Sequence, residues 1–341
     1  MRVYRRGDHG DEVADIQTRL VALGAVVDGT ERDGSFGETT EAAVRWFQED
    51  RHLLIDGLVG PDTWEQLVEA GWQLGDRTLY YRAPMFRGDD VRELQRKLNA
   101  LGFDCGKEDG LYGPSTDSAI RLFQRNVGDE SDGIVGPHTL AVLQRMRPLE
   151  AAPSRALVRE REQMKASRGP IAGRVIAVDA GDGPGERDDV QQRSAQALVE
   201  ELQAAGADAR LLPGGGEAAA PSDRARLANE TGAAAAITID LEAREEAAPG
   251  PVCSYFGTRT THSPSGLVLA QLILEELEAA LDRSGRLRPL TIAPLRETRM
   301  PAVQVEPVGA SGEERAALKD PDFPLRIARA VAAGVGRFFS G

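Results

Sequence analysis

The sequence predicts a multi-domain protein in which two small all-α modules, each of three helices, precede one α/β domain with a mostly parallel sheet flanked by helices. Two observations predict the helical modules: a turn that begins with Asp-Gly occurs four times before residue 148, and an amphipathic helix precedes each pair of these turns. A third predicts the α/β domain: from residue 173 onward, short apolar strands alternate with amphipathic helices.

Composition narrows the possible function. The chain has 341 residues and a net charge of -13, which argues against nucleic acid or an anionic membrane as its main partner. No apolar stretch is long enough to form a transmembrane segment, and the start MRVYRRGDHGDEV does not resemble a secretory signal. The two cysteines, Cys105 and Cys253, fall in different predicted domains. We therefore expect a cytoplasmic protein without a disulfide scaffold.

The first helix of each module is predicted by its apolar spacing. GDEVADIQTRLVALG and GDDVRELQRKLNALG each repeat apolar residues every three or four positions, which places them on one helical face. In the first helix these residues are Val13, Ile16, Leu20 and Leu23, and in the second they are Val91, Leu94, Leu98 and Leu101. Apolar residues of later helices should complete the two cores, among them Val44, Trp46, Phe47, Ile120 and Phe123.

The four turns read DGSFGETT, DGLVGPDT, DGLYGPST and DGIVGPHT. Within each pair the Asp positions are 23 residues apart, and the pairs are offset by 76, which indicates a tandem duplication. Gly after Asp adopts positive φ at low cost, so we interpret the motif as structural. Its residues are Asp33, Gly34, Asp56, Gly57, Asp109, Gly110, Asp132 and Gly133. A Thr follows each turn, and we expect it to cap the next helix: Thr39, Thr63, Thr116 and Thr139.

The order of these motifs resembles the peptidoglycan-binding domain of bacterial cell-wall enzymes. A GDxVxxLQxxL helix (with Ile16 at the first Leu position in the first copy), a DGxxGxxT turn, an xxFQ helix and a second DGxxGxxT turn make up this pattern. The resemblance implies small helical bundles that dock either glycan-peptide material or a protein. We place module 1 at residues 1–74, module 2 at 75–148, and a charged linker at 149–172.

The remaining residues, 173–341, form the predicted α/β domain. Strands are expected at RVIAVDA, ADARLLP, AAITIDL, VCSYFG and AVQVEPV. Helices are expected at residues 188–205, SDRARLANETGA, SPSGLVLAQLILEELEAAL and FPLRIARAVAAGVGRFF.

This half resembles the zinc-dependent N-acetylmuramoyl-L-alanine amidases, which cut the bond between the sugar chain and the peptide stem of peptidoglycan. The resemblance rests on VIAVDAGDG, ITIDLEA, SPSGLVLAQLI and LRETRMPAVQVEPVG. In that family two His and one Glu bind zinc, and a later Glu is the general base. The resemblance implies that Asp182 and Asp240 stand at the two His positions. Glu186 is the candidate for the metal-binding Glu, although it lies about one position early, and Glu306 keeps the position of the base.

A count of histidines supports the loss of the metal site. The chain has four His, and only His262 lies in this half, within the polar stretch THSPSG. One imidazole cannot supply a site that needs two, so we expect no functional catalytic residue and no zinc or other cofactor. The four acids would then line a former active site; magnesium or calcium bound by oxygen ligands is the alternative. Cys253 is expected to be a packed core thiol.

The three-domain order resembles the CwlM-type proteins of actinobacteria, which regulate cell-wall precursor synthesis from inside the cell. It implies a non-catalytic regulator or adaptor that binds peptidoglycan, its precursors or a cell-wall biosynthetic protein, in the cytoplasm or at the inner membrane face through a partner. Two alternatives stay open: an active amidase with an atypical metal site, and a peptidoglycan-binding structural protein.

Overall fold

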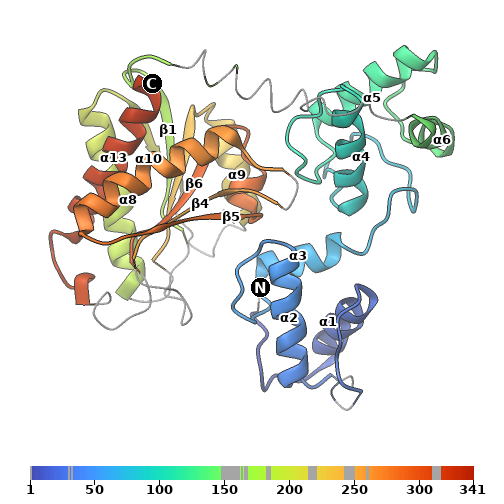
Figure 1. The fold of residues 1–341 in the computed structure, drawn as a ribbon, viewed down its shortest axis with the longest axis horizontal. Coiled ribbons are helices and arrows are strands. Elements are labelled where there is room, and N and C mark those ends of the chain that lie inside the picture. Colours follow the sequence, from blue (N-terminus) through green and yellow to red (C-terminus); the bar gives the residue numbers. More distant parts are fainter. Residues whose placement is uncertain are drawn as a thin grey trace. The chain divides into compact units, whose positions relative to one another are not determined.

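A computed structural model gives the fold of the chain, which divides into two compact units, Met1–Glu162 and Gln163–Gly341 (Figure 1). It describes residues 2–29, 31, 34–146, 162, 164, 168–181, 186–213, 221–241, 250–258, 261–308 and 316–341, with the backbone alone for 186–188. No helix in these ranges combines the length and apolar character that a membrane span requires.

The N-terminal unit consists of the two predicted all-α modules, each with three helices (Figure 1). The first contains α1 (Asp11–Ala22), α2 (Glu38–Asp50) and α3 (Pro61–Glu69), and the second contains α4 (Asp89–Ala100), α5 (Pro114–Val127) and α6 (Pro137–Arg145). Pro begins α3, α5 and α6, where its missing N–H has no intrahelical partner to lose.

Apolar faces of these helices form the module cores, as their spacing predicts. In α1, Val13, Ile16 and Leu20 are fully buried. Trp46 is an exception, because 43% of it is exposed. The core-facing side of α2 is formed by its neighbours Ala43, Val44 and Phe47, and position 46 lies outside this face, toward solvent. The expectation that Trp46 belongs to the core is therefore wrong.

A buried glutamine holds each Asp-Gly turn. In module 1, Gln48 of α2 donates from Nε2 to Asp56 Oδ1 at 2.7 Å, to Leu58 O at 2.9 Å and to Thr63 Oγ1 at 3.1 Å. Its Oε1 accepts the backbone N–H of Gly57 at 2.9 Å. One amide group thus contacts the turn at its Asp, its Gly, the next residue and the following helix. We call this arrangement the glutamine clamp.

The clamp recurs in module 2. Gln95 and Gln124 donate to Asp109 and Asp132 at 2.7 Å each. They accept the N–H groups of Gly110 at 2.8 Å and Gly133 at 2.9 Å. In the first turn Gln17 accepts from Gly34 at 3.2 Å, while Asp33 lies outside the described residues.

The predicted threonine caps are wrong. Gly37, Gly60, Gly113 and Gly136 occupy the N-cap positions of these helices, so the N-cap residue has no side chain to cap them. In α2 the carboxylate of Glu31 accepts the N–H groups of Thr39 and Thr40, at 3.2 and 3.0 Å. The Thr hydroxyl accepts a hydrogen bond from the glutamine clamp instead. In the first turn the residue that does so is Thr40, at 2.9 Å from Gln17 Nε2, and not Thr39. Thr39 donates to Glu31 at 2.7 Å.

Positive φ at the turn glycines is confirmed. The angle is 91° at Gly34, 74° at Gly57, 78° at Gly110 and 74° at Gly133. At Gly133 an added Cβ would also lie 2.4 Å from Asp117 Oδ1, so that side chain would have to shift.

The C-terminal unit is an α/β domain with a six-stranded sheet in the order β2-β1-β3-β6-β4-β5. Its strands are β1 (Val175–Asp179), β2 (Asp208–Leu211), β3 (Ala235–Ile239), β4 (Val252–Phe256), β5 (Arg286–Leu290) and β6 (Ala302–Glu306). The first four in this order are mutually parallel. Strand β4 runs antiparallel to β6 and parallel to β5. The sheet is therefore mixed and mostly parallel, as predicted.

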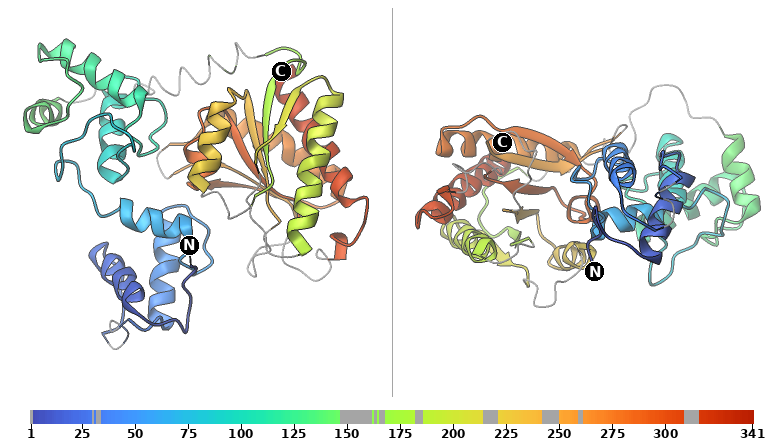
Figure 2. Two further views of the ribbon diagram at one scale, coloured as in Figure 1. Left: turned by 180° about the vertical axis from the view of Figure 1, so that it is seen from behind. Right: turned by 90° about the horizontal axis from the view of Figure 1, so that it is seen from below.

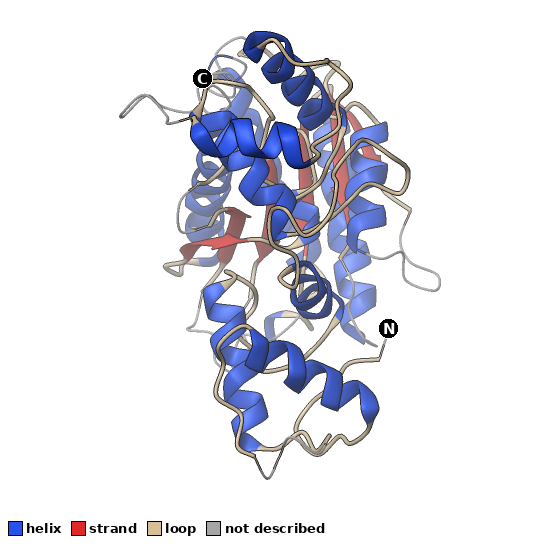
Figure 3. Ribbon diagram, turned by 90° about the vertical axis from the view of Figure 1, so that its right-hand side faces the viewer, coloured by secondary structure: helices blue, strands red, loops and turns tan. Residues whose placement is uncertain are grey.

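Helices cover both faces of this sheet, whose strands are red in Figure 3. Helices α8 (Glu186–Ala204), α10 (Pro264–Leu281) and α13 (Phe323–Ser340) pack together on one face, and α9 (Pro221–Glu230) and α11 (Ala293–Arg296) pack together on the other (Figure 2). Cys253 is fully buried in the core, and its burial raises the pKa of the thiol, which confirms a packed core cysteine. His262 is exposed, as predicted.

Candidate functional site

Two of the predicted site residues meet at the carboxyl edge of the sheet. Glu306 is the last residue of β6, and Asp240 directly follows the last residue of β3. These strands are parallel neighbours, so their carboxyl ends lie on the same edge. The backbone N–H of Asp240 donates to Val305 O at 2.9 Å, which keeps the two acids in adjacent register. Both are buried, with exposed fractions of 8% for Asp240 and 5% for Glu306.

Gln304 connects the two carboxylates. It lies two residues before Glu306 on β6, so the two side chains share one face of the strand. Its Nε2 donates to Asp240 Oδ2 at 2.7 Å and to Glu306 Oε1 at 3.4 Å. The amide thereby supplies one of the donors that the buried acids require.

Arg288 of β5 forms an ion pair with Glu306 Oε1. Its Nε also donates to Ser254 Oγ on β4 at 3.1 Å. The strand register explains this reach, because Ser254 pairs with Arg288 on one side and with Gln304 on the other. The ion pair is largely shielded from water, since the side chain of Arg288 is 20% exposed and that of Glu306 is 6% exposed. The charge of Glu306 is therefore neutralised by a residue of this chain.

The other two predicted site residues cannot be placed in this network. Asp182 lies outside the described residues, and Glu186 begins α8 without a described side chain. Among the four acids, the structure thus brings together Asp240 and Glu306.

These residues do not fit a zinc centre. Zinc sites of this type use two imidazoles and a carboxylate, and leave one position for water. Here Asp240 offers an oxygen that already accepts an amide N–H, and Glu306 is paired with a guanidinium. No group of three or more His, Cys, Asp or Glu residues in the described ranges could hold a metal ion.

Sequence reasoning did not identify Arg288, Gln304 or Ser254. Gln304 carried a usable signal, because a polar residue two positions before Glu306 in the strand AVQVE must point to the same side of the sheet. Arg288 carried none, since its strand RLRPL contains a Pro and was not predicted.

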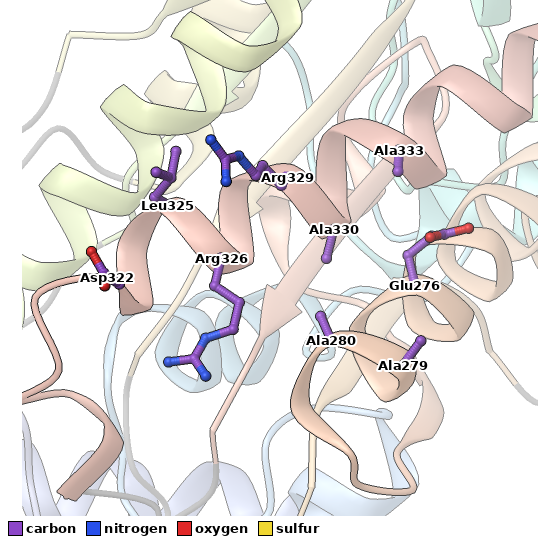
Figure 4. Close-up of a pocket in the computed structure, with 9 residues that line it drawn as sticks. All are labelled: Glu276, Ala279, Ala280, Asp322, Leu325, Arg326, Arg329, Ala330 and Ala333. Atoms are coloured by element: carbon purple, nitrogen blue, oxygen red, sulfur yellow. The ribbon is translucent and has the colours of Figure 1, made fainter.

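A separate groove lies between the C-terminal half of α10 and the N-terminal half of α13 (Figure 4). Ala280 and Ala330 face each other across it, and Arg326 and Arg329 project from α13. Arg329 pairs with Glu201 at 3.2 Å. None of the predicted site residues lines this groove, so it is distinct from the acidic site.

Comparison with known proteins gives matches along both units. The family model described as a putative peptidoglycan binding domain matches residues 9–67 and 87–143, and the N-acetylmuramoyl-L-alanine amidase model matches residues 176–337. The chain is 33% identical over 364 residues to N-acetylmuramoyl-L-alanine amidase CwlM of Mycobacterium tuberculosis, covering 98% of this chain and 89% of that protein.

Two further similarities cover parts of the chain. N-acetylmuramoyl-L-alanine amidase CwlL of Bacillus licheniformis is 33% identical over 161 residues, covering 41% of this chain and 45% of that protein. The crystal structure of the amidase Ami1 of Mycobacterium smegmatis aligns with 18% identity and a TM-score of 0.44, covering 50% of this chain and 99% of that one.

Proposed function

Because the chain belongs to the N-acetylmuramoyl-L-alanine amidase family, with two peptidoglycan-binding segments ahead of its amidase domain, we propose that it is a non-catalytic member of that family. In this proposal it acts as a regulator or adaptor in peptidoglycan synthesis. It binds peptidoglycan, its precursors or a cell-wall biosynthetic protein.

The ion pair between Arg288 and Glu306 carries this proposal. The resemblance to the amidases gives Glu306 the position of the general base. A general base must reach the proton of the attacking water, and it needs a metal ion nearby to acidify that water. Here the guanidinium of Arg288 forms an ion pair with the carboxylate of Glu306. Asp240 stands at a position where the resemblance places a metal-binding His. The single His of this half of the chain, His262, is exposed.

An assay of peptide release tests the proposal. Purified full-length protein is incubated with peptidoglycan, with and without added zinc, and peptide stems released from the glycan are quantified by mass spectrometry. We expect no release above the buffer background, and the same background for Glu306→Gln. A purified active amidase is the positive control. Zinc-stimulated release that Glu306→Gln abolishes would contradict the proposal.

An active amidase with an oxygen-ligand metal is the second candidate. It is supported by the convergence of Asp240 and Glu306 on one amide group, because carboxylate oxygens suit magnesium or calcium. Metal analysis of the purified protein separates the two candidates. The non-catalytic proposal expects far less than one bound ion per chain, and a stoichiometric metal favours the second candidate.

We also propose an intracellular site of action, in the cytoplasm or at the inner membrane face through a partner. Its support is that Cys105 and Cys253 are both buried thiols in different units, which suits a reducing compartment. Fractionation of cells tests it, with the protein expected outside the wall fraction. Recovery mainly from the wall would contradict this location.

A further inference from the structure

We propose that the segment Tyr80–Met85, between α3 and α4, binds glycan chains that carry carboxylates, as the glycan-peptide of peptidoglycan does. We call this segment the junction loop. The inference rests on the proposed function and assigns residues to its binding step.

The junction loop is an insertion in an otherwise repeated pattern. Each module pairs its N-terminal segment with its two turns through two isolated β-bridges, Tyr4–Val59 and His9–Ser35 in module 1, and Leu79–Val135 and Arg87–Leu111 in module 2. The two bridging residues are five positions apart in module 1, from 4 to 9, and eight apart in module 2, from 79 to 87. Three additional residues therefore extend the chain at a place where the fold of module 1 does not need them.

The side chains of this loop are exposed although most are apolar or aromatic. Tyr80 is 41% exposed, Tyr81 is 51% exposed and Met85 is 38% exposed. Trp72, which precedes the loop, is 39% exposed. Aromatic side chains such as Tyr and Trp offer a large apolar ring face together with a polar group, which suits a contact surface. Such a group on an inserted loop indicates a contact surface.

A stack of rings and guanidinium groups holds the loop in place. The guanidinium of Arg77 lies 4.4 Å from the ring centroid of Trp72 and 4.9 Å from that of Phe86. On the same Phe86 ring, the guanidinium of Arg82 lies at 4.0 Å, and Tyr80 packs edge-on at 5.3 Å. Arg82 is therefore ordered before any ligand arrives, which reduces the entropy lost on binding.

The two arginines of the stack differ in charge compensation. Arg77 pairs with the buried Asp90 at 2.7 Å. No carboxylate in the described part of the chain pairs with Arg82, whose contact is the Phe86 ring. An exposed guanidinium that has no carboxylate partner within the described part of the chain can bind an external carboxylate through two parallel hydrogen bonds.

The chemistry of the ligand follows from these two features. Exposed aromatic rings can cover the apolar faces of sugar rings, and the guanidinium of Arg82 can bind a carboxylate. Peptidoglycan presents both groups, since its sugar chain carries peptide stems with free carboxylates. An acidic protein segment would satisfy Arg82 as well. The loop, however, joins two segments that match the peptidoglycan-binding model, residues 9–67 and 87–143, and this position favours the glycan.

Calorimetric titration of the full-length protein with two probes tests the inference. One probe is the soluble disaccharide-pentapeptide of peptidoglycan, and the other is chitotetraose, a neutral sugar chain without carboxylates. We expect Arg82→Gln to weaken binding of the disaccharide-pentapeptide about tenfold and to leave chitotetraose binding unchanged. Tyr81→Ala should weaken both about fivefold, because it removes contact area shared by both probes.

Arg2→Gln is the matched control. Arg2 also lies over a tyrosine ring, 5.4 Å from the centroid of Tyr4, but it is paired with Asp8 at 2.9 Å. The substitution Arg2→Gln removes one positive charge from module 1, as Arg82→Gln does from the loop, and should leave the binding of both probes unchanged. Arg82→Lys should recover part of the affinity, since an ammonium keeps the charge but not the bidentate geometry. Melting temperatures of all variants should lie within about 3 °C of the wild-type value, because the altered side chains are exposed and their contacts contribute little to stability.

Three results would overturn the inference. If the wild type binds and the loop variants bind equally well, the site lies elsewhere while glycan binding stands. If the wild type binds neither probe, the loop assignment and the proposed glycan ligand both fail, and the non-catalytic proposal remains subject to the peptide-release assay. If a Glu-rich peptide binds in a loop-dependent way and the two probes do not, the loop belongs to a protein interface.

Discussion

The glutamine clamps explain why the Asp-Gly turn could be copied four times. In each, one buried amide satisfies the turn Gly N–H and contacts the following Thr. Such a turn needs a Gln in the preceding helix, and the sequence supplies Gln17, Gln48, Gln95 and Gln124. The structural motif therefore includes the glutamine of the preceding helix in addition to the eight residues of each turn.

Replacing a clamp glutamine should destabilise its module. In Gln95→Met the side chain keeps its length but loses its hydrogen bonds to Asp109, Gly110 and Thr116. We expect the free energy of unfolding of the N-terminal unit to fall by about 2–3 kcal/mol, because a buried N–H is left without a partner. Urea unfolding measures the change. Gln73→Met, at an exposed position, should be neutral, and equal stability of both variants would show that the clamp contributes little.

Rebuilding the lost imidazoles tests the ancestry of the acidic site. If Asp182 and Asp240 occupy former His positions, the double variant Asp182→His/Asp240→His should bind zinc at least about tenfold more tightly than either single variant. We expect weak binding, because the supporting side chains, among them Arg288 on Glu306, belong to a different network. Calorimetry with zinc measures it. A double variant that binds no better than wild type would show that the two positions do not converge.

At the scale of secondary-structure elements, the turn between α5 and α6 depends on the backbone conformation of its glycine. Gly133 has φ of 74°, and a Cβ there would contact Asp117 and Arg121. Gly133→Ala should therefore lower the stability of the N-terminal unit by about 1 kcal/mol or more. Gly29→Ala is the control, since φ of Gly29 lies outside the left-handed region and there is open space around it. Identical melting of the two variants would contradict this account of the turn.

Most of the elements could be predicted from sequence because their patterns are local. Repeated turns and apolar spacing predicted the six helices of the modules, and five of the six strands were predicted from apolar runs. The missing strand, β5, lies at the edge of the sheet, contains Pro289 and is mostly half-buried. An edge strand tolerates Pro and gives no continuous apolar run.

The candidate site was only partly predictable, because part of it depends on contacts between residues that are distant in sequence. Asp240 and Glu306 follow from a resemblance that keeps their places at strand ends. The partner of Glu306 comes from β5 and reaches it across β4, and the two residues are 18 positions apart in sequence. No local pattern reveals such a pair, because it depends on the antiparallel placement of β4.

At the level of the complete chain, the two compact units have separate apolar cores. We therefore expect heating to give at least two calorimetric transitions, one for each unit. Gly133→Ala should shift the transition of the N-terminal unit and leave the other unchanged. A single cooperative transition that moves as a whole with this substitution would contradict independent units.

The short span of the glutamine clamps has a further consequence for the order of folding. Gln48 and Gln124 contact their Asp partners over 8 residues, and Gln95 does so over 14. In the sheet, by contrast, Thr238 contacts Asp179 over 59 residues and Gln304 contacts Asp240 over 64. Closing short chain segments costs less entropy and is faster than closing long ones. During synthesis, the helical modules should therefore reach their native state while the later strands of the sheet are still being made.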